Sequence, residues 1–152
     1  MRVRITSEVP LPRGDIRRLR KSLARMLDEL LPGKAVELSA VLVDEDAIKR
    51  LNSRYLDSDE TTDVLAFPQM SAAELEEACR GGSPIEPIGD IVICVPVAAR
   101  QAAERNQTDF EELELLGAHG LLHLVGYDDA TDEDASAMAL AERRLLGRSI
   151  IS

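Results

Sequence analysis

The sequence is poor in aromatic residues and contains no tryptophan. Phe and Tyr make up 3% of its 152 residues, so the core is built from aliphatic side chains and little aromatic surface remains to stack nucleic-acid bases. Cysteine is scarce too, because Cys79 and Cys94 form neither a disulfide framework nor a CxxC ligand pair, which fits a reducing compartment. Cys94 lies in an apolar stretch without a visible base and is interpreted as a small buried hydrophobe.

Long apolar runs are absent as well. No stretch approaches the roughly 18 apolar residues that span a bilayer, and the first residues, MRVRITSEVP, lack a secretory apolar region. We therefore expect no membrane association and a cytoplasmic location. A glycine-rich phosphate loop is also missing, so no dinucleotide cofactor is expected.

A surplus of positive charge is likewise missing. The chain has 18 Lys and Arg against 28 Asp and Glu, a formal net charge of −10. Broad binding to phosphate backbones requires clustered Lys and Arg that displace counterions, so it is disfavoured here. Such a protein handles nucleic acid only through a local patch or through a partner.

The length and the hydrophobic pattern predict one α+β domain over residues 1–152, with a mixed sheet of about four strands packed with about five helices. Residues 69–88 are expected to be irregular, mobile and exposed, with one helical turn in SAAELEEAC. Helix starts are expected after Asp44, at Thr108 with Glu111, and at Thr131 with Asp134. The expected strands are 1–9 at an edge, 34–44, 61–68 and a central 89–97, and the expected helices are 15–31, 45–56, 97–105, 109–125 and 132–146.

The only two histidines, His119 and His123, lie at i and i+4 in a helix that is apolar on nearly all sides from Leu115 onward. This spacing lets two imidazole nitrogens reach one metal ion, and unpaired imidazoles would be costly in apolar surroundings. Gly126 is placed to end the helix, so that the returning loop can bring Asp128 or Asp129 over the same face as a third ligand. The alternative is a structural histidine pair beside a solvated acidic run at 128–134.

The pattern His-x-x-x-His-x-x-Gly-x-x-Asp has the spacing of the metzincin peptidase motif but lacks its general base. Those peptidases carry a glutamate as general base directly after the first histidine, where this chain has Gly120. Glycine accepts no proton, which argues against a peptidase. Its expected purpose is to let a backbone or a substrate come close.

Three blocks of the sequence resemble the YbeY family of bacterial endoribonucleases. HGLLHLVGYDD at 119–129 resembles the signature His-Gly-x-Leu-His-Leu-x-Gly-Tyr-Asp-His. LNSRYLDSDETTDVLAFP at 51–68 resembles the segment Leu-Asn-x-x-Tyr-Arg…Thr-Asp-Val-Leu-Ser-Phe-Pro, and GDIVIC at 89–94 resembles a Gly-Asp-Ile-Val-Ile strand. The blocks stand in the family's order, and EDASAMALAERRLL at 133–146 is also typical of it.

The resemblance implies a metal-dependent, single-strand-specific endoribonuclease that acts in ribosomal RNA maturation and ribosome biogenesis, with ribosomal RNA and ribosomal components as partners. It implies one divalent metal, zinc, held by three side chains that face a cleft beside the TDVLAFP strand. His119 and His123 match two of the ligands, and the third ligand, a histidine in the family, is Asp129 here. The resemblance names no catalytic base.

A second departure from the family pattern is Leu56, which replaces an arginine suited to steadying phosphate. Lys49, Arg50 and Arg54 are nearby in sequence and either substitute for it or are ordinary exposed charges. With Asp129, Leu56 leaves open a catalytically impaired, ribosome-associated binding protein that retains the fold. A third reading is an iron enzyme with two histidines and one carboxylate. Asp63 and Asp90 are expected to cap or brace strand ends, or to orient water or a ligand histidine.

Overall fold

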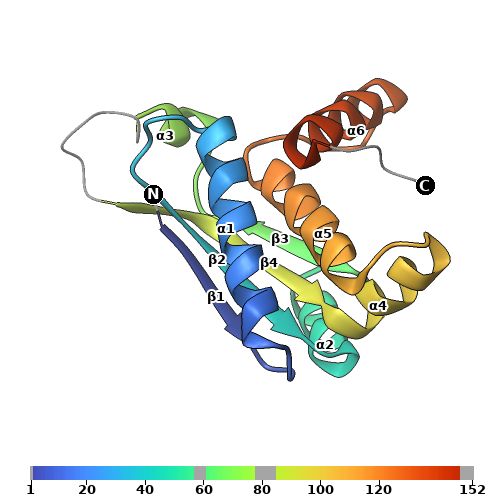
Figure 1. Cartoon of the computed structure of the whole chain (residues 1–152). Helices are drawn as coiled ribbons and strands as arrows, with labels where there is room; N and C mark the ends of the chain where they lie inside the picture. Colours follow the sequence, from blue (N-terminus) through green and yellow to red (C-terminus); the bar gives the residue numbers. More distant parts are fainter. Residues whose placement is uncertain (1, 57–60, 78–84, 148–152) are drawn as a thin grey trace.

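The computed structural model describes residues 2–56, 61–77 and 85–147. In this part of the chain four strands form one mixed sheet in the order β1-β2-β4-β3 (Figure 1). Strands β1, β2 and β4 are parallel to one another, and β3 runs antiparallel to β4. The expected edge and central strands are therefore confirmed. The strands are β1 Arg2–Ser7, β2 Val36–Val43, β3 Val64–Pro68 and β4 Glu86–Cys94.

Helices cover both faces of this sheet (Figure 1). Helices α1 and α5 pack side by side on one face, α6 packs on α5, and α2 covers part of the other face. The helices are α1 Arg13–Leu30, α2 Glu45–Leu56, α3 Ala72–Glu77, α4 Val95–Glu104, α5 Asp109–Leu124 and α6 Asp132–Leu146. This confirms the α+β class with a four-stranded mixed sheet. No helix in the described ranges is long and apolar enough to cross a membrane.

Both predicted ends of the central strand were wrong. The strand expected at 89–97 ends at Cys94, and α4 already begins at Val95. Its Pro96 is tolerated in the first helical turn, where a backbone N–H has no partner within the helix, so the β-branched run hid the change to helix. Strand β4 also begins earlier than expected, because Glu86 pairs with Val36 of β2. The helical turn expected near residue 75 is α3, whereas residues 78–84 lie outside the described part.

The expected helix caps are present. The Asp44 carboxylate accepts a hydrogen bond from the Ala47 N–H at 2.8 Å, and Thr131 Oγ1 accepts one from the Asp134 N–H at 3.0 Å. At the start of α5, the Thr108 side chain accepts from the Glu111 N–H and the Glu111 side chain accepts from the Thr108 N–H. This reciprocal capping box satisfies two backbone donors that have no partner within the helix.

Gly126 ends α5 by reversing the chain. Its φ of +110° is a conformation that favours glycine. The Tyr127 N–H donates to the Leu122 carbonyl at 3.0 Å, and the Gly126 N–H donates to the His123 carbonyl at 3.2 Å, which is the Schellman arrangement. The segment after Gly126 therefore turns back along α5 before α6 begins.

Helix α5 lies unusually close to its neighbours because of two glycines. A Cβ at Gly120 would stand 2.7 Å from Ile91 Cγ2 of β4, and one at Gly117 would stand 2.8 Å from Leu23 Cδ2 of α1. Both separations are shorter than packed carbon atoms allow. A close approach at Gly120 was expected from a backbone or a substrate, and the atoms that come close are instead the Ile91 and Val64 side chains of the sheet.

Candidate metal centre

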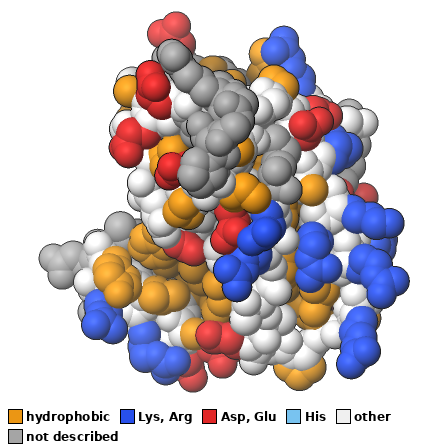
Figure 2. Space-filling model, turned by 90° about the vertical axis from the view of Figure 1, so that its left-hand side faces the viewer, with side chains coloured by type: hydrophobic (Ala, Val, Ile, Leu, Met, Phe, Trp, Pro, Cys, Tyr) orange, Lys and Arg blue, Asp and Glu red, His pale blue; other side chains and the backbone are white. Residues whose placement is uncertain are grey.

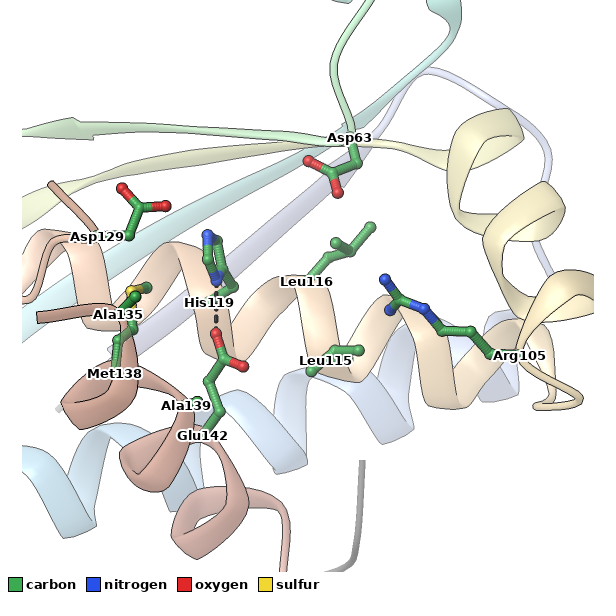
Figure 3. Close-up of a pocket in the computed structure, with 10 residues that line it drawn as sticks. All are labelled: Asp63, Arg105, Leu115, Leu116, His119, Asp129, Ala135, Met138, Ala139 and Glu142. Carbon is green, nitrogen blue, oxygen red and sulfur yellow. Dashed lines mark hydrogen bonds and ion pairs between the residues drawn. The ribbon is translucent and has the colours of Figure 1, made fainter. Parts of the chain in front are cut away.

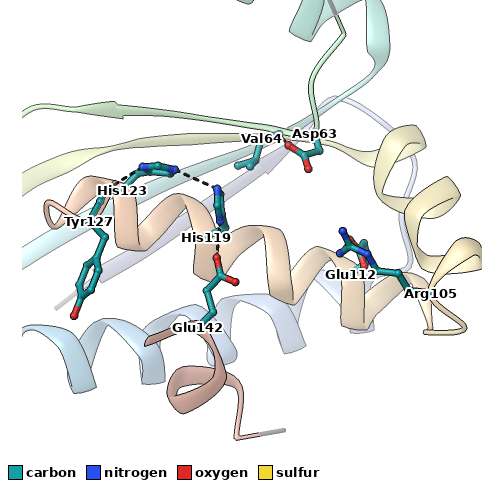
Figure 4. Close-up of polar contacts among 8 residues, drawn as sticks. All are labelled: Asp63, Val64, Arg105, Glu112, His119, His123, Tyr127 and Glu142. Atoms are coloured by element: carbon teal, nitrogen blue, oxygen red, sulfur yellow. Dashed lines mark hydrogen bonds and ion pairs between the residues drawn. The ribbon is translucent and has the colours of Figure 1, made fainter. Parts of the chain in front are cut away.

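The two histidines project from the same face of α5, and their Nε2 atoms face each other at 3.1 Å (Figure 4). The Nδ1 atom of each ring contacts an oxygen atom on the side away from the other histidine. His119 Nδ1 lies 2.5 Å from Glu142 Oε1 of α6, and His123 Nδ1 lies 3.1 Å from the Tyr127 carbonyl oxygen. Each acceptor fixes a proton on Nδ1 and leaves the Nε2 lone pair directed at the other ring.

This arrangement fits a cation. Two Nε2 lone pairs at 3.1 Å repel each other unless a positive centre lies between them. Two imidazole ligands at 2.0–2.1 Å from a tetrahedral zinc ion have nitrogens about 3.3 Å apart, close to the observed separation. The pair is therefore spaced for a tetrahedral ion, and in the metal-free protein a proton on one Nε2 turns the same contact into a hydrogen bond.

Asp129 joins this pair from the loop after α5. One ligand atom from each of His119, His123 and Asp129 lies within 4.8 Å of the others. The exposed Asp129 carboxylate thus lies close enough to the histidine pair to complete a set of three ligands. Asp128, the other expected candidate, accepts a hydrogen bond from the Ala130 N–H at 3.2 Å and lines a neighbouring hollow. The structure thus brings Asp129 to the histidines rather than Asp128.

A cavity of about 330 Å³ opens beside His119, between α5, α6 and the start of β3 (Figure 3). Three carboxylates line it, from Asp63, Asp129 and Glu142, and one cation, from Arg105. The Arg105 guanidinium is partly neutralised, because it lies 2.8 Å from the buried carboxylate of Glu112. Without a metal the cavity is therefore negatively charged.

The carboxylates around His119 raise the pKa of its imidazole. The hydrogen bond with Glu142 raises the pKa of the imidazole above its ordinary value and outweighs the effect of burial, which lowers it. The charges of Glu142, Asp63 and Asp129 add to the increase. In the metal-free protein, protonated His119 therefore persists to a higher pH than an isolated histidine.

Comparison with known proteins identifies the family to which this chain belongs. The model of the family Endoribonuclease YbeY matches residues 6–149. The chain belongs to the YbeY endoribonuclease family. Endoribonuclease YbeY of Salinispora tropica is 43% identical over 124 residues, covering 79% of this chain and 78% of the relative. Endoribonuclease YbeY of Thermobifida fusca is 36% identical over 151 residues, covering 96% of this chain and 92% of the relative.

A solved structure extends the likeness to the fold. The solution structure of TM1509 from Thermotoga maritima matches with a TM-score of 0.64 at 28% identity, and the match covers 95% of this chain and 86% of that chain. Membership in the YbeY family supports an endoribonuclease role, that is, an enzyme that hydrolyses RNA. The resemblance read from the three sequence blocks is thereby confirmed.

Two aspartates of the sequence blocks that resemble YbeY, Asp63 and Asp90, accept hydrogen bonds from neighbouring residues. The Asp63 carboxylate accepts hydrogen bonds from the Val64 N–H at 2.8 Å and from Gln101 Nε2 at 3.3 Å, and it also faces the metal cavity (Figure 3). Asp90 accepts a hydrogen bond from Gln69 Nε2 at 2.9 Å and does not line that cavity. Asp63 thus both braces the start of β3 and lines the site, whereas Asp90, in the middle of β4 rather than at a strand end, contacts the side chain of the residue that follows β3.

None of the basic residues near Leu56 in the sequence lines the cavity in the described part of the chain. Leu56 is the last residue of α2, and its side chain lies outside the described part. Arg50 and Arg54 line a separate groove on the other face of the sheet, and Lys49 is exposed on the same helix. Among the cavity-lining residues in the described part, the only positive side chain is Arg105, which sequence reasoning did not single out.

Sequence reasoning also missed Glu142. This residue is 23 positions from His119 and lies on a different helix, so no local spacing connects the two. The available signal was chemical. A ligand histidine needs an acceptor for its second ring nitrogen, and Glu142 is the one acid of α6 beyond its first turn.

Proposed function

We propose that this chain is a metal-dependent endoribonuclease that cleaves single-stranded RNA during ribosomal RNA maturation and ribosome biogenesis, in the cytoplasm. The observation that carries the metal dependence is the convergence of His119 Nε2 and His123 Nε2 at 3.1 Å, with Asp129 beside them. Family membership supports the RNA substrate. Ribosomal RNA and ribosomal components would be the partners that bring the substrate to this acidic protein.

His119, His123 and Asp129 would hold one divalent metal, and zinc suits two imidazoles and a carboxylate. Three protein ligands leave a coordination position open, which is characteristic of catalytic rather than structural zinc sites. A bound ion would supply Lewis acidity to the scissile phosphate and lower the pKa of water. The carboxylate in place of the family's histidine makes the ligand set harder and reduces the net charge of the centre.

The charges of the cavity favour binding of metal before RNA. The lining carries three carboxylates against one guanidinium, a formal charge of −2 when the histidines are neutral. An RNA phosphate is repelled by this surface, whereas a divalent cation is attracted and neutralises it. Glu142 holds the His119 ring in place during this exchange, and Asp63 presents acceptor oxygens from the opposite wall.

The test is cleavage of single-stranded RNA by protein purified with zinc, with and without a chelator. We expect stoichiometric metal, chelator-sensitive cleavage, and loss of both in His123→Ala. Cleavage that survives this substitution would point to a contaminating nuclease. Stoichiometric ribosome binding without metal or cleavage would instead establish the non-catalytic binding protein.

Restoring the family residue sharpens the test. Asp129→His replaces the carboxylate with the longer imidazole that the family signature has at this position. We expect Asp129→Ala to lose metal and cleavage, and Asp129→His to retain both. Equal metal content in Asp129→Ala and the unmodified protein would remove Asp129 from the ligand set.

A further inference from the structure

Positive charge is concentrated in α1, although the whole chain carries a net −10. Helix α1 as a whole has six basic and three acidic side chains, a net of +3, and within it residues 13–25 have six basic side chains and one acidic one, a net of +5. An ordinary solvated helix face mixes both signs. This segregation resembles the local patch that an acidic protein needs in order to bind nucleic acid.

Four of these side chains form what we call the α1 basic stripe: Arg13, Arg17, Arg20 and Lys21. Their spacing of three or four residues puts them on one face of the helix, and all four are exposed. None forms an ion pair with another described residue. Two further arginines of the helix are engaged, because Arg18 lies 3.9 Å over the Phe110 ring and Arg25 lies 3.0 Å from Glu29.

The stripe faces away from the metal centre. The flank of α1 that carries Ser22 and Arg18 contacts α5 through Glu114 and Phe110. The stripe occupies the other flank, toward the edge strand β1. Figure 2 shows this side of the molecule, where Lys and Arg side chains gather along the part formed by α1.

We infer that the α1 basic stripe binds the phosphate backbone of the RNA, at a segment other than the one in the metal centre. Three of its four members are arginines, whose planar forks bind phosphate oxygens in pairs. From Arg13 to Lys21 the stripe extends about 12 Å along the helix, which allows several phosphate contacts. The inference rests on the proposed function for the identity of the RNA, but not for the presence of a phosphate-binding surface.

An anionic membrane fits this surface less well than RNA does. Membrane-surface helices insert an apolar face beside their basic one. The apolar face of α1 is already buried in the core, since Leu19, Leu23 and Leu27 are 0–1% exposed. The stripe can therefore offer charge alone, which matches the regular charge of a nucleic-acid backbone.

The position of the stripe sets the size of the RNA that it recognises. Helix α1 and helix α5 lie between the stripe and the cavity, so a tetranucleotide in the cavity does not reach the stripe (Figure 1). A larger folded RNA can contact both surfaces. Because the rest of the chain is negative, the stripe would also turn this side of the molecule toward the RNA as it approaches.

The experiment compares two triple variants with the same change in charge. Arg13→Gln/Arg17→Gln/Arg20→Gln removes most of the stripe, and Lys49→Gln/Arg50→Gln/Arg54→Gln removes three charges from α2, across the sheet. Glutamine is a good helix former, so exposed sites tolerate it. The probe is an RNA hairpin with a single-stranded tail, and its dissociation constant is measured over a series of salt concentrations, with circular dichroism to check folding.

Each lost phosphate contact reduces the slope of log K against log salt by about 0.7 to 0.9. The stripe variant should lose about 2 to 3 in this slope and about 100- to 500-fold in affinity at 0.1 M salt, whereas the α2 variant should lose far less. Arg13→Lys/Arg17→Lys/Arg20→Lys, which keeps the charge, should retain the slope. Equal losses in the stripe and α2 variants, or an unchanged slope in the stripe variant, would overturn the inference.

Two further arms separate this inference from the proposed function. Cleavage of a tetranucleotide should be the same in the stripe variant and the unmodified protein, because that substrate occupies only the cavity. No cleavage in the unmodified protein would refute the proposed function and leave the salt-slope result standing. Loss of binding to vesicles of anionic phospholipid, with hairpin binding intact, would assign the stripe to membranes and overturn the inference.

Discussion

Substitution of Glu142 by glutamine tests how the metal centre is oriented. The change removes the negative charge that lies 2.5 Å from His119 Nδ1 and keeps the shape of the side chain. A carboxylate behind a ligand histidine orients the ring and makes its other nitrogen more basic, and its loss typically reduces metal affinity by about 10- to 100-fold. That range corresponds to about 1.4–2.7 kcal/mol of binding free energy.

The pH dependence gives this prediction a second signature. Protons compete with metal for His119, so affinity in the unmodified protein should rise with pH through the raised pKa of this histidine and level off above it. Glu142→Gln removes the main cause of the raised pKa, so its rise in affinity should lie at lower pH. The deficit of the variant should therefore be greatest at high pH and should shrink as the pH falls.

Competition with a chromophoric zinc chelator, repeated across pH, measures both quantities. Glu133→Gln is the matched control, because it removes an exposed acid from the same helix that does not line the cavity. The control should bind zinc like the unmodified protein. An affinity for zinc that is unchanged at high pH in Glu142→Gln, or a pH profile that does not move, would refute the orienting role of the carboxylate.

Three other perturbations have expected outcomes. In the metal-free protein, the pair of protonated His119 and Glu142 contributes stability that is fully present below the ordinary histidine pKa and lost as pH rises through the raised one. Thermal unfolding should therefore show Glu142→Gln to be destabilised at acidic pH and near parity in alkaline buffer; a deficit independent of pH would contradict this. Gly120→Ala would bring Cβ to 2.7 Å from Ile91 Cγ2, and denaturant unfolding should show a loss of about 1–3 kcal/mol, as overpacking does. Unchanged stability there would mean that α5 can shift. Asp129→Ala should lower zinc affinity in calorimetry without lowering the stability of the metal-free protein, because the residue is exposed; parallel losses would mark it as structural.

The sequence was most informative where local spacing decides the structure. The i,i+4 histidines, the glycine after them and the capping residues at Thr108 and Thr131 all act within one or two turns of a helix, and each was found where expected. The edge position of β1 and the central position of β4 followed from the hydrophobic pattern, because a strand that is covered on both faces is a nearly continuous apolar run.

Features that depend on packing between distant segments could not be predicted in this way. Glu142 reaches His119 only because α6 folds back on α5, and Arg105 enters the cavity through the turn between α4 and α5. The choice of Asp129 over Asp128 depends on the path of the loop after the Schellman turn. The end of β4 was misplaced because Val95 and Val97 are good strand formers, and the tertiary structure overrides their preference.

The close packing of α5 divides the metal centre into a constrained part and an adaptable part. His119 and His123 stand on a helix whose glycines press against the sheet and α1, so a ligand of another length at either position would need the core to repack. Asp129 stands on an exposed loop whose backbone can accommodate a shorter or a longer side chain. In the proposed metal centre the third position is therefore the one that can exchange histidine for aspartate without disturbing the core, and it is the position where this chain differs from the signature that its sequence resembles.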